Sequence, residues 1–236
     1  MLDATDLRFR KGKLVALMGA NGAGKSSLLR VLAGIQDPLQ GEVRWNDRVL
    51  RDIPLAERPR LVASLFRSFA RTNGLSLWDL VALGRHPYTG FFGKLTSADC
   101  AAVDASIGQV GMQAFAHASI HTLSDGEFQK AMVAKMLAQD ASVMLLDEPT
   151  THLDLPSSIE LLQLLSQLTS VQGKTVVFST HNVALALQLA DDVLLLGEEG
   201  GAVMGPPDEI ANHELMCGFL RSSHVRIENG NLRYTF

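Results

Sequence analysis

Residues Gly19–Ser26 read GANGAGKS. It fits the pattern G-x-x-x-x-G-K-[ST], in which backbone N–H groups and a lysine hold the phosphates of a nucleotide. The apolar run Leu14–Met18 before it is typical of a buried parallel strand, and SLLRVLAG (27–34) after it has apolar residues at helical spacing. This order predicts an ATP or GTP site. The alternative is a glycine-rich turn in an α/β domain that binds no nucleotide.

Each part of this loop has an expected role. The glycines let backbone N–H groups curl around the β-phosphate because they have no Cβ atom to clash with it. Lys25 is expected to reach the β- and γ-phosphates, and the Ser26 hydroxyl to ligate Mg²⁺. The predicted ATP-binding residues are Gly19, Ala20, Asn21, Gly22, Ala23, Gly24, Lys25, Ser26 and Ser27.

The composition of the 236 residues is that of an ordered α/β protein, with 47% hydrophobic and 19% charged residues. A formal net charge of -4 without a basic run argues against nucleic acid as a partner. No apolar stretch reaches the roughly 18 to 20 residues of a membrane helix, and residues 1–13 lack the apolar segment of a secretory signal. Cys100 and Cys217 have no C-x-x-C spacing, so we expect two buried thiols in a reducing, cytoplasmic compartment.

Strands and helices are expected to alternate along the rest of the chain. Turn residues Asn46 and Asp47 predict a hairpin, and Ser97 and Ser124 are candidate N-caps of two helices. The other expected elements are strands at 61–66, 141–149 and 174–181, helices from Ser76 or Leu77 and at 157–170 and 183–192, and a closing hairpin around 199–201 with a helical tail. This order predicts an α/β fold with a mainly parallel sheet and an antiparallel β portion, and with an α-helical insertion.

Two acids stand at the end of a predicted buried strand. Val143–Leu146 leads into Asp147 and Glu148, and Pro149 then stops the strand. The carboxyl ends of parallel strands meet at one edge of a sheet, where ligands of open α/β sheets bind. We therefore expect both carboxylates beside the phosphate loop.

Five motifs in this order resemble those of an ABC transporter ATP-binding subunit. They are GANGAGKS, LSDGE (Leu123–Glu127), VMLLDEPT (143–150), THLD (151–154) and STH (179–181). The stretches VALGRHPYTGFFGKLTSAD (81–99) and DLPSSIELLQLL (154–165) resemble the subclass that takes up iron-siderophore, haem and cobalamin chelates. The resemblance implies a P-loop NTPase fold, with 1–236 as one ABC ATPase domain and a helical subdomain at about 72–140.

The resemblance also assigns catalytic and metal-binding roles. Asp147 would hold Mg²⁺ through water together with Ser26, and Glu148 would be the general base that orients the attacking water. His181 would contact the γ-phosphate. The alternative for His181 is a hydrogen-bonded core histidine.

A second set of residues would act across a dimer. Ser124 and Gly126 begin a helix whose N-terminus can meet the γ-phosphate of ATP bound to a partner subunit. Asp125 and Glu127 flank them, and Asp154 is expected to line the same dimer contact. ATP would then lie between two copies of the chain, which would work with membrane permease subunits and, indirectly, with a substrate-binding protein.

Three departures from the family pattern stand out. No aromatic residue lies at the distance upstream of the core strand where the family has one that stacks on adenine. Arg67 occupies the position of the Gln-loop glutamine, and a guanidinium has donors only, so it cannot ligate Mg²⁺. The signature reads LSDGE in place of LSGGQ, which adds the carboxylates of Asp125 and Glu127 near a phosphate.

The function that follows is an ATP-hydrolysing subunit of an importer for a metal chelate, attached to the inner face of the cell membrane. ATP and Mg²⁺ are its expected ligands. Two alternatives remain at this point: a degenerate nucleotide-binding module with little hydrolysis, or an ABC ATPase that does not transport. Arg67 and the absent aromatic favour the first, whereas Lys25, Asp147, Glu148 and His181 oppose it.

Overall fold

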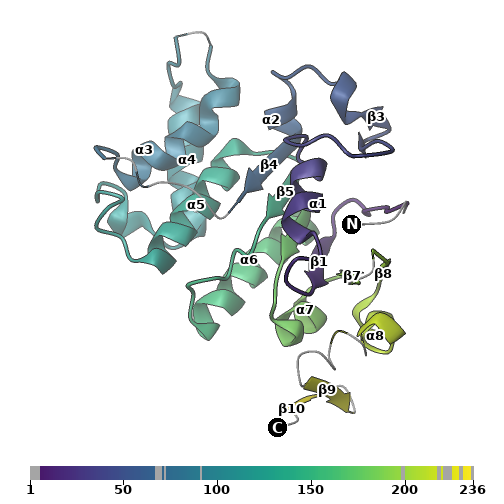
Figure 1. Ribbon diagram of the computed structural model, residues 1–236. Helices are drawn as coiled ribbons and strands as arrows, with labels where there is room; N and C mark the ends of the chain where they lie inside the picture. Colours follow the sequence, from purple (N-terminus) through teal and green to yellow (C-terminus); the bar gives the residue numbers. More distant parts are fainter. Residues whose placement is uncertain are drawn as a thin grey trace.

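A six-stranded sheet lies at the centre of the computed structural model, in the order β4-β5-β6-β1-β7-β8 (Figure 1). The structure describes residues 6–66, 71, 73–90, 92–197, 200–216 and 219, and the backbone of 225–228 and 231–234. The first five strands are parallel and β8 pairs antiparallel with β7. The predicted mainly parallel sheet with an antiparallel portion is therefore confirmed. The strands are β1 (Leu14–Gly19), β4 (Val62–Leu65), β5 (Val143–Leu146), β6 (Thr175–Ser179), β7 (Asp192–Leu196) and β8 (Ala202–Gly205).

Both faces of this sheet are covered, which explains why its strands are almost continuously apolar. In β1, Val15 and Leu17 point into one hydrophobic cluster, while Leu14, Ala16 and Met18 point into the other. All residues of β1 are buried. The helices over the sheet are α1 (Lys25–Leu32) on the face of Val15, and α5 (Asp125–Gln139), α6 (Leu155–Gln172), α7 (Val183–Leu189) and α8 (Pro207–Ala211) on the other.

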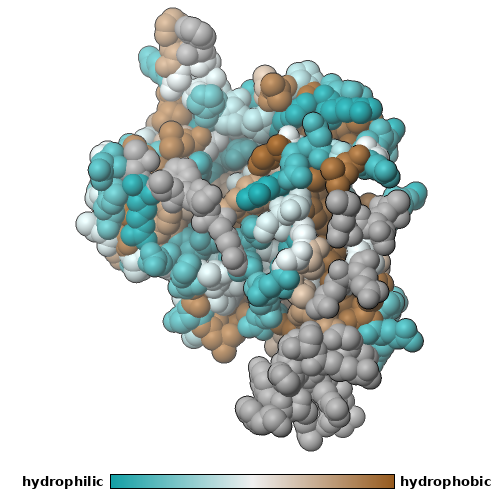
Figure 2. Space-filling model, viewed as in Figure 1, coloured by the Kyte–Doolittle hydropathy of each residue, from teal (hydrophilic) through white to brown (hydrophobic). Residues whose placement is uncertain are grey.

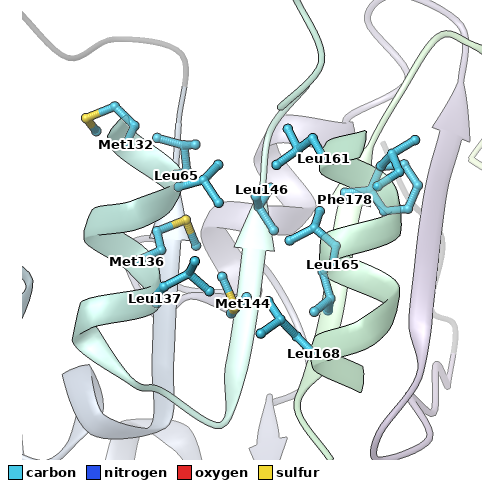
Figure 3. Close-up of a cluster of buried hydrophobic side chains, with 14 of the residues drawn as sticks. Leu65, Met132, Met136, Leu137, Met144, Leu146, Leu161, Leu165, Leu168 and Phe178 are labelled. Atoms are coloured by element: carbon cyan, nitrogen blue, oxygen red, sulfur yellow. The ribbon is translucent and has the colours of Figure 1, made fainter. Parts of the chain in front are cut away.

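The larger cluster fixes α5 and α6 against β5. Figure 3 shows Met144 and Leu146 of β5 between these two helices, with Met136 on α5 and Leu165 on α6. Burying an apolar side chain of this size stabilises the fold by about 1.5–3 kcal/mol. Because Asp125 begins α5 and Asp147 follows β5, this packing also fixes the positions of both acidic motifs.

A group of helices packs on α5 away from the sheet (Figure 1). The group contains α3 (Leu77–Ala82), the 3-10 helix η2 (Leu83–Tyr88) and α4 (Ser97–Gln109), and the 3-10 helix η3 (Gln113–Phe115) packs on α4. Ser76 caps α3 and Ser124 caps α5, as expected. The cap of α4 was predicted wrongly, because Thr96 and not Ser97 accepts the hydrogen bond from the Asp99 N–H and completes a capping box.

The smaller elements agree with the turn residues in the sequence. Strands β2 (Arg44–Trp45) and β3 (Arg48–Val49) form the predicted hairpin, and its turn has positive φ angles at Asn46 (50°) and Asp47 (63°). Asparagine and aspartate tolerate this conformation better than most residues. The remaining described elements are η1 (Leu50–Asp52), α2 (Arg58–Leu61), β9 (Val225–Glu228) and β10 (Asn231–Tyr234).

Two further expectations concern the strand pair at the edge and the cysteines. The predicted closing hairpin exists as β7 and β8, although residues 198–199 of its turn lie outside the described residues. Cys100 is only half-buried, so the expectation of a fully buried thiol was wrong there. Cys217 lies outside the described residues.

In the part of the chain that the structure describes, no helix is long and apolar enough to cross a bilayer.

An ion pair joins the helices that pack on α5. Nε of Arg85 donates to Oδ1 of Asp99 at 2.9 Å, and Nη1 of Arg85 donates to the carbonyl of Ala138 at 2.8 Å. The hydroxyl and backbone N–H of Thr96, and then Arg85, hold the pKa of Asp99 at about 2. Arg85 therefore ties η2 to both α4 and α5.

Gly84 allows η2 to lie directly against α5, and this contact gives a test of the packing. A Cβ atom on Gly84 would lie 2.3 Å from the carbonyl oxygen of Lys135, which is closer than real contacts allow. We expect Gly84→Ala to lower the free energy of unfolding by about 1–3 kcal/mol, measured by urea unfolding. Gly90→Ala is the matched control, since a Cβ atom there would have no neighbour within 4 Å among the described residues. Equal stability of the two variants would contradict this packing.

Candidate functional site

The phosphate loop lies between the end of β1 and the start of α1. Gly24 is the N-cap of α1 and has a φ of 96°, a left-handed conformation that favours glycine. No side chain caps this helix, so its first N–H groups face the loop, where an anion can accept from them. The buried Nζ atom of Lys25 donates to the carbonyl oxygens of Gly19 at 2.7 Å and Ala20 at 3.0 Å. The nine predicted ATP-binding residues thus run from the last residue of β1, through one turn, into the first residues of α1.

The two predicted acids lie at the same sheet edge, and a third residue joins them. Ser179 ends β6, and its hydroxyl donates to Oδ1 of Asp147 at 2.6 Å and accepts from the backbone N–H of Glu148 at 2.8 Å. In the β1–β6 register Ser179 is opposite Leu17, two residues before Gly19. Asp147 and Ser179 are both buried. The carboxyl ends of β1, β5 and β6 therefore form one site.

Ser179 is a residue that the sequence-based assignment of the site left out. It stands in the quoted motif STH, directly at the end of a predicted apolar strand. The sequence did contain a signal for Ser179: it is a hydroxyl residue at the carboxyl end of a predicted buried strand, and a neighbouring predicted strand ends in an Asp-Glu pair. Periodicity could not show its partners, because they are 31 and 32 residues away in the sequence.

Both carboxylate oxygens of Glu148 have partners. Nε2 of His181 lies 2.5 Å from Oε1 of Glu148, and the hydroxyl of Thr151 donates to Oε2 at 3.1 Å. The side chain of Glu148 is 10% exposed, and its φ is 52°, which is uncommon for a residue with a side chain. Such backbone conformations persist where surrounding contacts impose them, and they concentrate at functional sites. Glu148 and His181 line one pocket of about 340 Å³.

The residues at this edge fit Mg²⁺ bound together with a nucleotide. Mg²⁺ takes one or two carboxylate or hydroxyl ligands from the protein and completes its shell with water and phosphate oxygens. Ser179 orients Asp147 through one carboxylate oxygen, as outer hydrogen bonds do for metal ligands. Among the described residues no group of three or more His, Cys, Asp or Glu could hold a metal ion alone. A site built from Ser26, Asp147 and substrate phosphates needs no such group.

The LSDGE motif forms the start of α5. Ser124 is the N-cap, and Oε2 of Glu127 accepts from the Ser124 N–H at 2.8 Å and from its hydroxyl at 2.7 Å. These two hydrogen bonds lower the pKa of Glu127. Asp125 pairs with Arg71, a contact that the sequence did not predict. Gly126 leaves space for the next loop, because a Cβ there would lie 3.2 Å from the Leu153 side chain.

Asp154, another predicted site residue, lies at the start of α6. Asp154 is the N-cap of α6 and accepts from the N–H of Ser157 at 2.9 Å. Hydrogen bonding with the side chain of Ser157, and then with its backbone N–H, lowers the pKa of Asp154. It thus stabilises the start of a helix, and its expected contact with a second subunit stays a prediction. Arg67 lies outside the described residues.

A large groove adjoins the phosphate loop on the side of the β2–β3 hairpin. Its volume is about 1580 Å³, and its lining includes Phe9, Trp45 and the loop residues Gly22, Ala23 and Gly24. Figure 2 shows hydrophobic residues exposed between hydrophilic ones on the face that carries α1 and this hairpin. Trp45 is held there by a hydrogen bond from its indole N–H to the Leu32 carbonyl at 3.2 Å.

The chain is similar to known proteins of one family. A model of the ABC transporter family matches residues 2–151. The petrobactin import ATP-binding protein FpuD of Bacillus anthracis is 33% identical over 221 residues, which cover 94% of this chain and 81% of FpuD.

Solved structures are similar as well. An inward-facing structure described as a metal-chelate type ABC transporter superposes with a TM-score of 0.79 at 27% identity, covering 94% of this chain and 84% of that chain. The dimeric structure of the bacterial ABC transporter cassette MJ0796 has a TM-score of 0.78 at 25% identity, covering 87% and 90%.

The family match over residues 2–151, the similarity to FpuD over 94% of the chain and the arrangement of phosphate loop, Asp147 and Glu148 lead to one conclusion: the chain belongs to the ABC transporter family, as one of its ATP-binding subunits with an ABC ATPase fold.

Proposed function

We propose that the chain hydrolyses ATP to power the import of a metal chelate through separate membrane subunits. The observation that carries this proposal is the junction of Asp147, Glu148 and Ser179 at the sheet edge beside the phosphate loop. A buried carboxylate and a second, oriented carboxylate beside a glycine-rich turn are the groups that this proposal needs for a metal ion and for a water molecule. A chain that only bound nucleotide would not need the second carboxylate.

The residues divide the work of hydrolysis. The N–H groups of the loop and Lys25 bind the β- and γ-phosphates. Ser26 and Asp147 would hold Mg²⁺, which would supply positive charge against the phosphates. Glu148 accepts a proton from the attacking water or orients it. His181, 2.5 Å from Glu148, contacts the γ-phosphate and holds the glutamate in place.

The substrate class is proposed from relatives. FpuD is named for petrobactin import, and the structure with the higher TM-score of the two described above is that of a metal-chelate type transporter. An iron-siderophore complex, or a haem or cobalamin chelate, is therefore the cargo that we propose. The chain would sit on the inner face of the cell membrane, in the cytoplasm, bound to permease subunits that receive the chelate from a binding protein.

The proposed assembly contains two copies of the chain. Two observations support this: the cassette MJ0796 is dimeric, and Ser124 and Asp125 at the N-terminus of α5 are exposed. Ser124 and Gly126 of one copy would then contact the γ-phosphate of ATP on the other, and Asp154 would line the contact. We further propose that residues 1–236 form one ABC ATPase domain with a helical subdomain at about 72–140, supported by the packing of α3 and α4 on α5.

Removing the loop lysine tests nucleotide binding. Lys25→Ala deletes a cation that faces the β- and γ-phosphates, so we expect the affinity for Mg²⁺-ATP to fall at least about tenfold by calorimetry. Lys94→Ala is the control, since Lys94 is an exposed lysine outside the loop. Unchanged ATP affinity in a Lys25→Ala protein with a normal melting transition would rule out the phosphate-loop assignment.

Replacing the proposed base tests hydrolysis. Glu148→Gln keeps the shape of the side chain but cannot accept a proton, so we expect ATP binding to persist and turnover to fall by about 100-fold or more. Dimers should accumulate in ATP. Glu57→Gln, at a half-exposed glutamate paired with Arg48, is the control for loss of one carboxylate. If wild-type protein hydrolyses ATP no faster than Glu148→Gln, the alternative of a degenerate nucleotide-binding module is correct.

A further inference from the structure

The LSDGE motif contains two carboxylates, those of Asp125 and Glu127, at a helix end that is proposed to meet a phosphate. In the proposed dimer, the first turn of α5 faces the γ-phosphate of ATP on the second copy, and this turn contains Asp125 and Glu127. A carboxylate close to a phosphate repels it, and the effect is stronger where water is excluded. The inference rests on the proposed function, because it concerns that same dimer contact.

The carboxylate of Glu127 is turned back onto its own helix. It accepts two hydrogen bonds from Ser124, one from the backbone N–H and one from the hydroxyl, while the Glu127 N–H donates to the Ser124 hydroxyl at 3.3 Å. This reciprocal arrangement is a capping box, and it stabilises the start of the helix. The carboxylate of Glu127 thus has a structural role within its own helix.

Asp125 has no such local partner, and it is compensated by a residue distant in the sequence. Nη2 of Arg71 lies 2.6 Å from Oδ1 of Asp125. Arg71 belongs to the connection between β4 and α3, 54 residues before Asp125. The side chain of Asp125 is 73% exposed and that of Arg71 is 25% exposed, so the arginine is the more buried partner.

Two more contacts fix the guanidinium of Arg71. Its Nη1 atom donates to the carbonyl of Leu123 at 2.8 Å, and its central carbon stands 4.7 Å from the centre of the Phe128 ring. Leu123 precedes the N-cap Ser124, and Phe128 follows the first turn. Exposed ion pairs commonly contribute little to protein stability, because two long side chains lose entropy when they pair. Here the arginine is already held by a carbonyl and an aromatic face, so its charge stays beside Asp125.

We propose that Arg71 neutralises Asp125 within the same subunit and thereby lets this acidic signature accept the γ-phosphate of ATP from a second copy. Arg71 is a positioning residue: it contacts Leu123, Asp125 and Phe128 on both sides of the N-cap. Without it, the first turn of α5 would present an uncompensated carboxylate to the phosphate. With it, the partial positive charge of the helix N-terminus remains available.

The test is a double-mutant cycle on ATP-driven dimerisation. The parent is the full chain with Glu148→Gln, in Mg²⁺-ATP, and the measured quantity is the protein concentration of half-dimerisation by sedimentation. The four proteins are the parent, Arg71→Met, Asp125→Asn and the double variant. Methionine keeps an apolar stem against Phe128 but removes the charge, and Arg71→Gln serves as a second variant if Arg71→Met fails to fold.

The proposal predicts a coupling between the two positions. Arg71→Met should raise the half-dimerisation concentration at least about fivefold at about 50 mM NaCl, and by less at about 500 mM, because salt screens exposed charges. In the Asp125→Asn background the same substitution should change it by less than about twofold. Arg51→Met, at an arginine with 72% exposure, is the control for loss of one positive charge.

Two outcomes would overturn the proposal, and they are distinguishable. An equal effect of Arg71→Met in both backgrounds, or no effect in a parent that dimerises, would show that Arg71 does not act through Asp125, and would leave the proposed function intact. A parent that stays monomeric in Mg²⁺-ATP would overturn the proposed dimer together with this inference.

Discussion

Two hydrogen bonds of one buried hydroxyl hold the site together. Ser179, at the end of β6, donates to Asp147 and accepts from the N–H of Glu148, and both acids follow β5. Because β1, β6 and β5 are parallel neighbours, the phosphate loop and both carboxylates leave the sheet at one edge. The hydroxyl orients the carboxylate of Asp147 and supports the unusual backbone of Glu148, whose φ is 52°. The proposed chemistry depends on this junction.

The packing of the core also fixes the position of the LSDGE motif relative to the site at the sheet edge. The helix α5 begins at the LSDGE motif and ends beside β5, and its buried face lies against Met144 and Leu146. A shift of the helices that pack on α5 would therefore move the signature relative to the sheet edge. Arg85 and the close approach at Gly84 fix η2 to α5, and Arg71 ties the connection before α3 to the start of α5.

Local patterns in the sequence predicted much of this architecture. The phosphate loop, the parallel strands, the hairpin at Asn46–Asp47 and the cap at Ser124 all rest on neighbouring residues, and the structure contains them. The α4 cap was misplaced by one residue, since Thr96 and Ser97 can both cap and only the capping box with Asp99 separates them. The pairs Ser179–Asp147 and Arg71–Asp125 could not be predicted, because they join residues 32 and 54 positions apart and leave no periodic pattern.

In the proposed reaction the Ser179 hydroxyl orients the two acids for hydrolysis of Mg²⁺-ATP. The most direct measurement is the steady-state ATPase rate of Ser179→Ala, compared with Ser106→Ala, which removes another buried hydroxyl, one that donates to Ala102 on α4. We expect kcat of Ser179→Ala to be at least about tenfold below wild type, which corresponds to one hydrogen bond of about 1.4 kcal/mol, and kcat of Ser106→Ala to be unchanged. Equal rates for wild type and both variants, all folded, would contradict this role of Ser179.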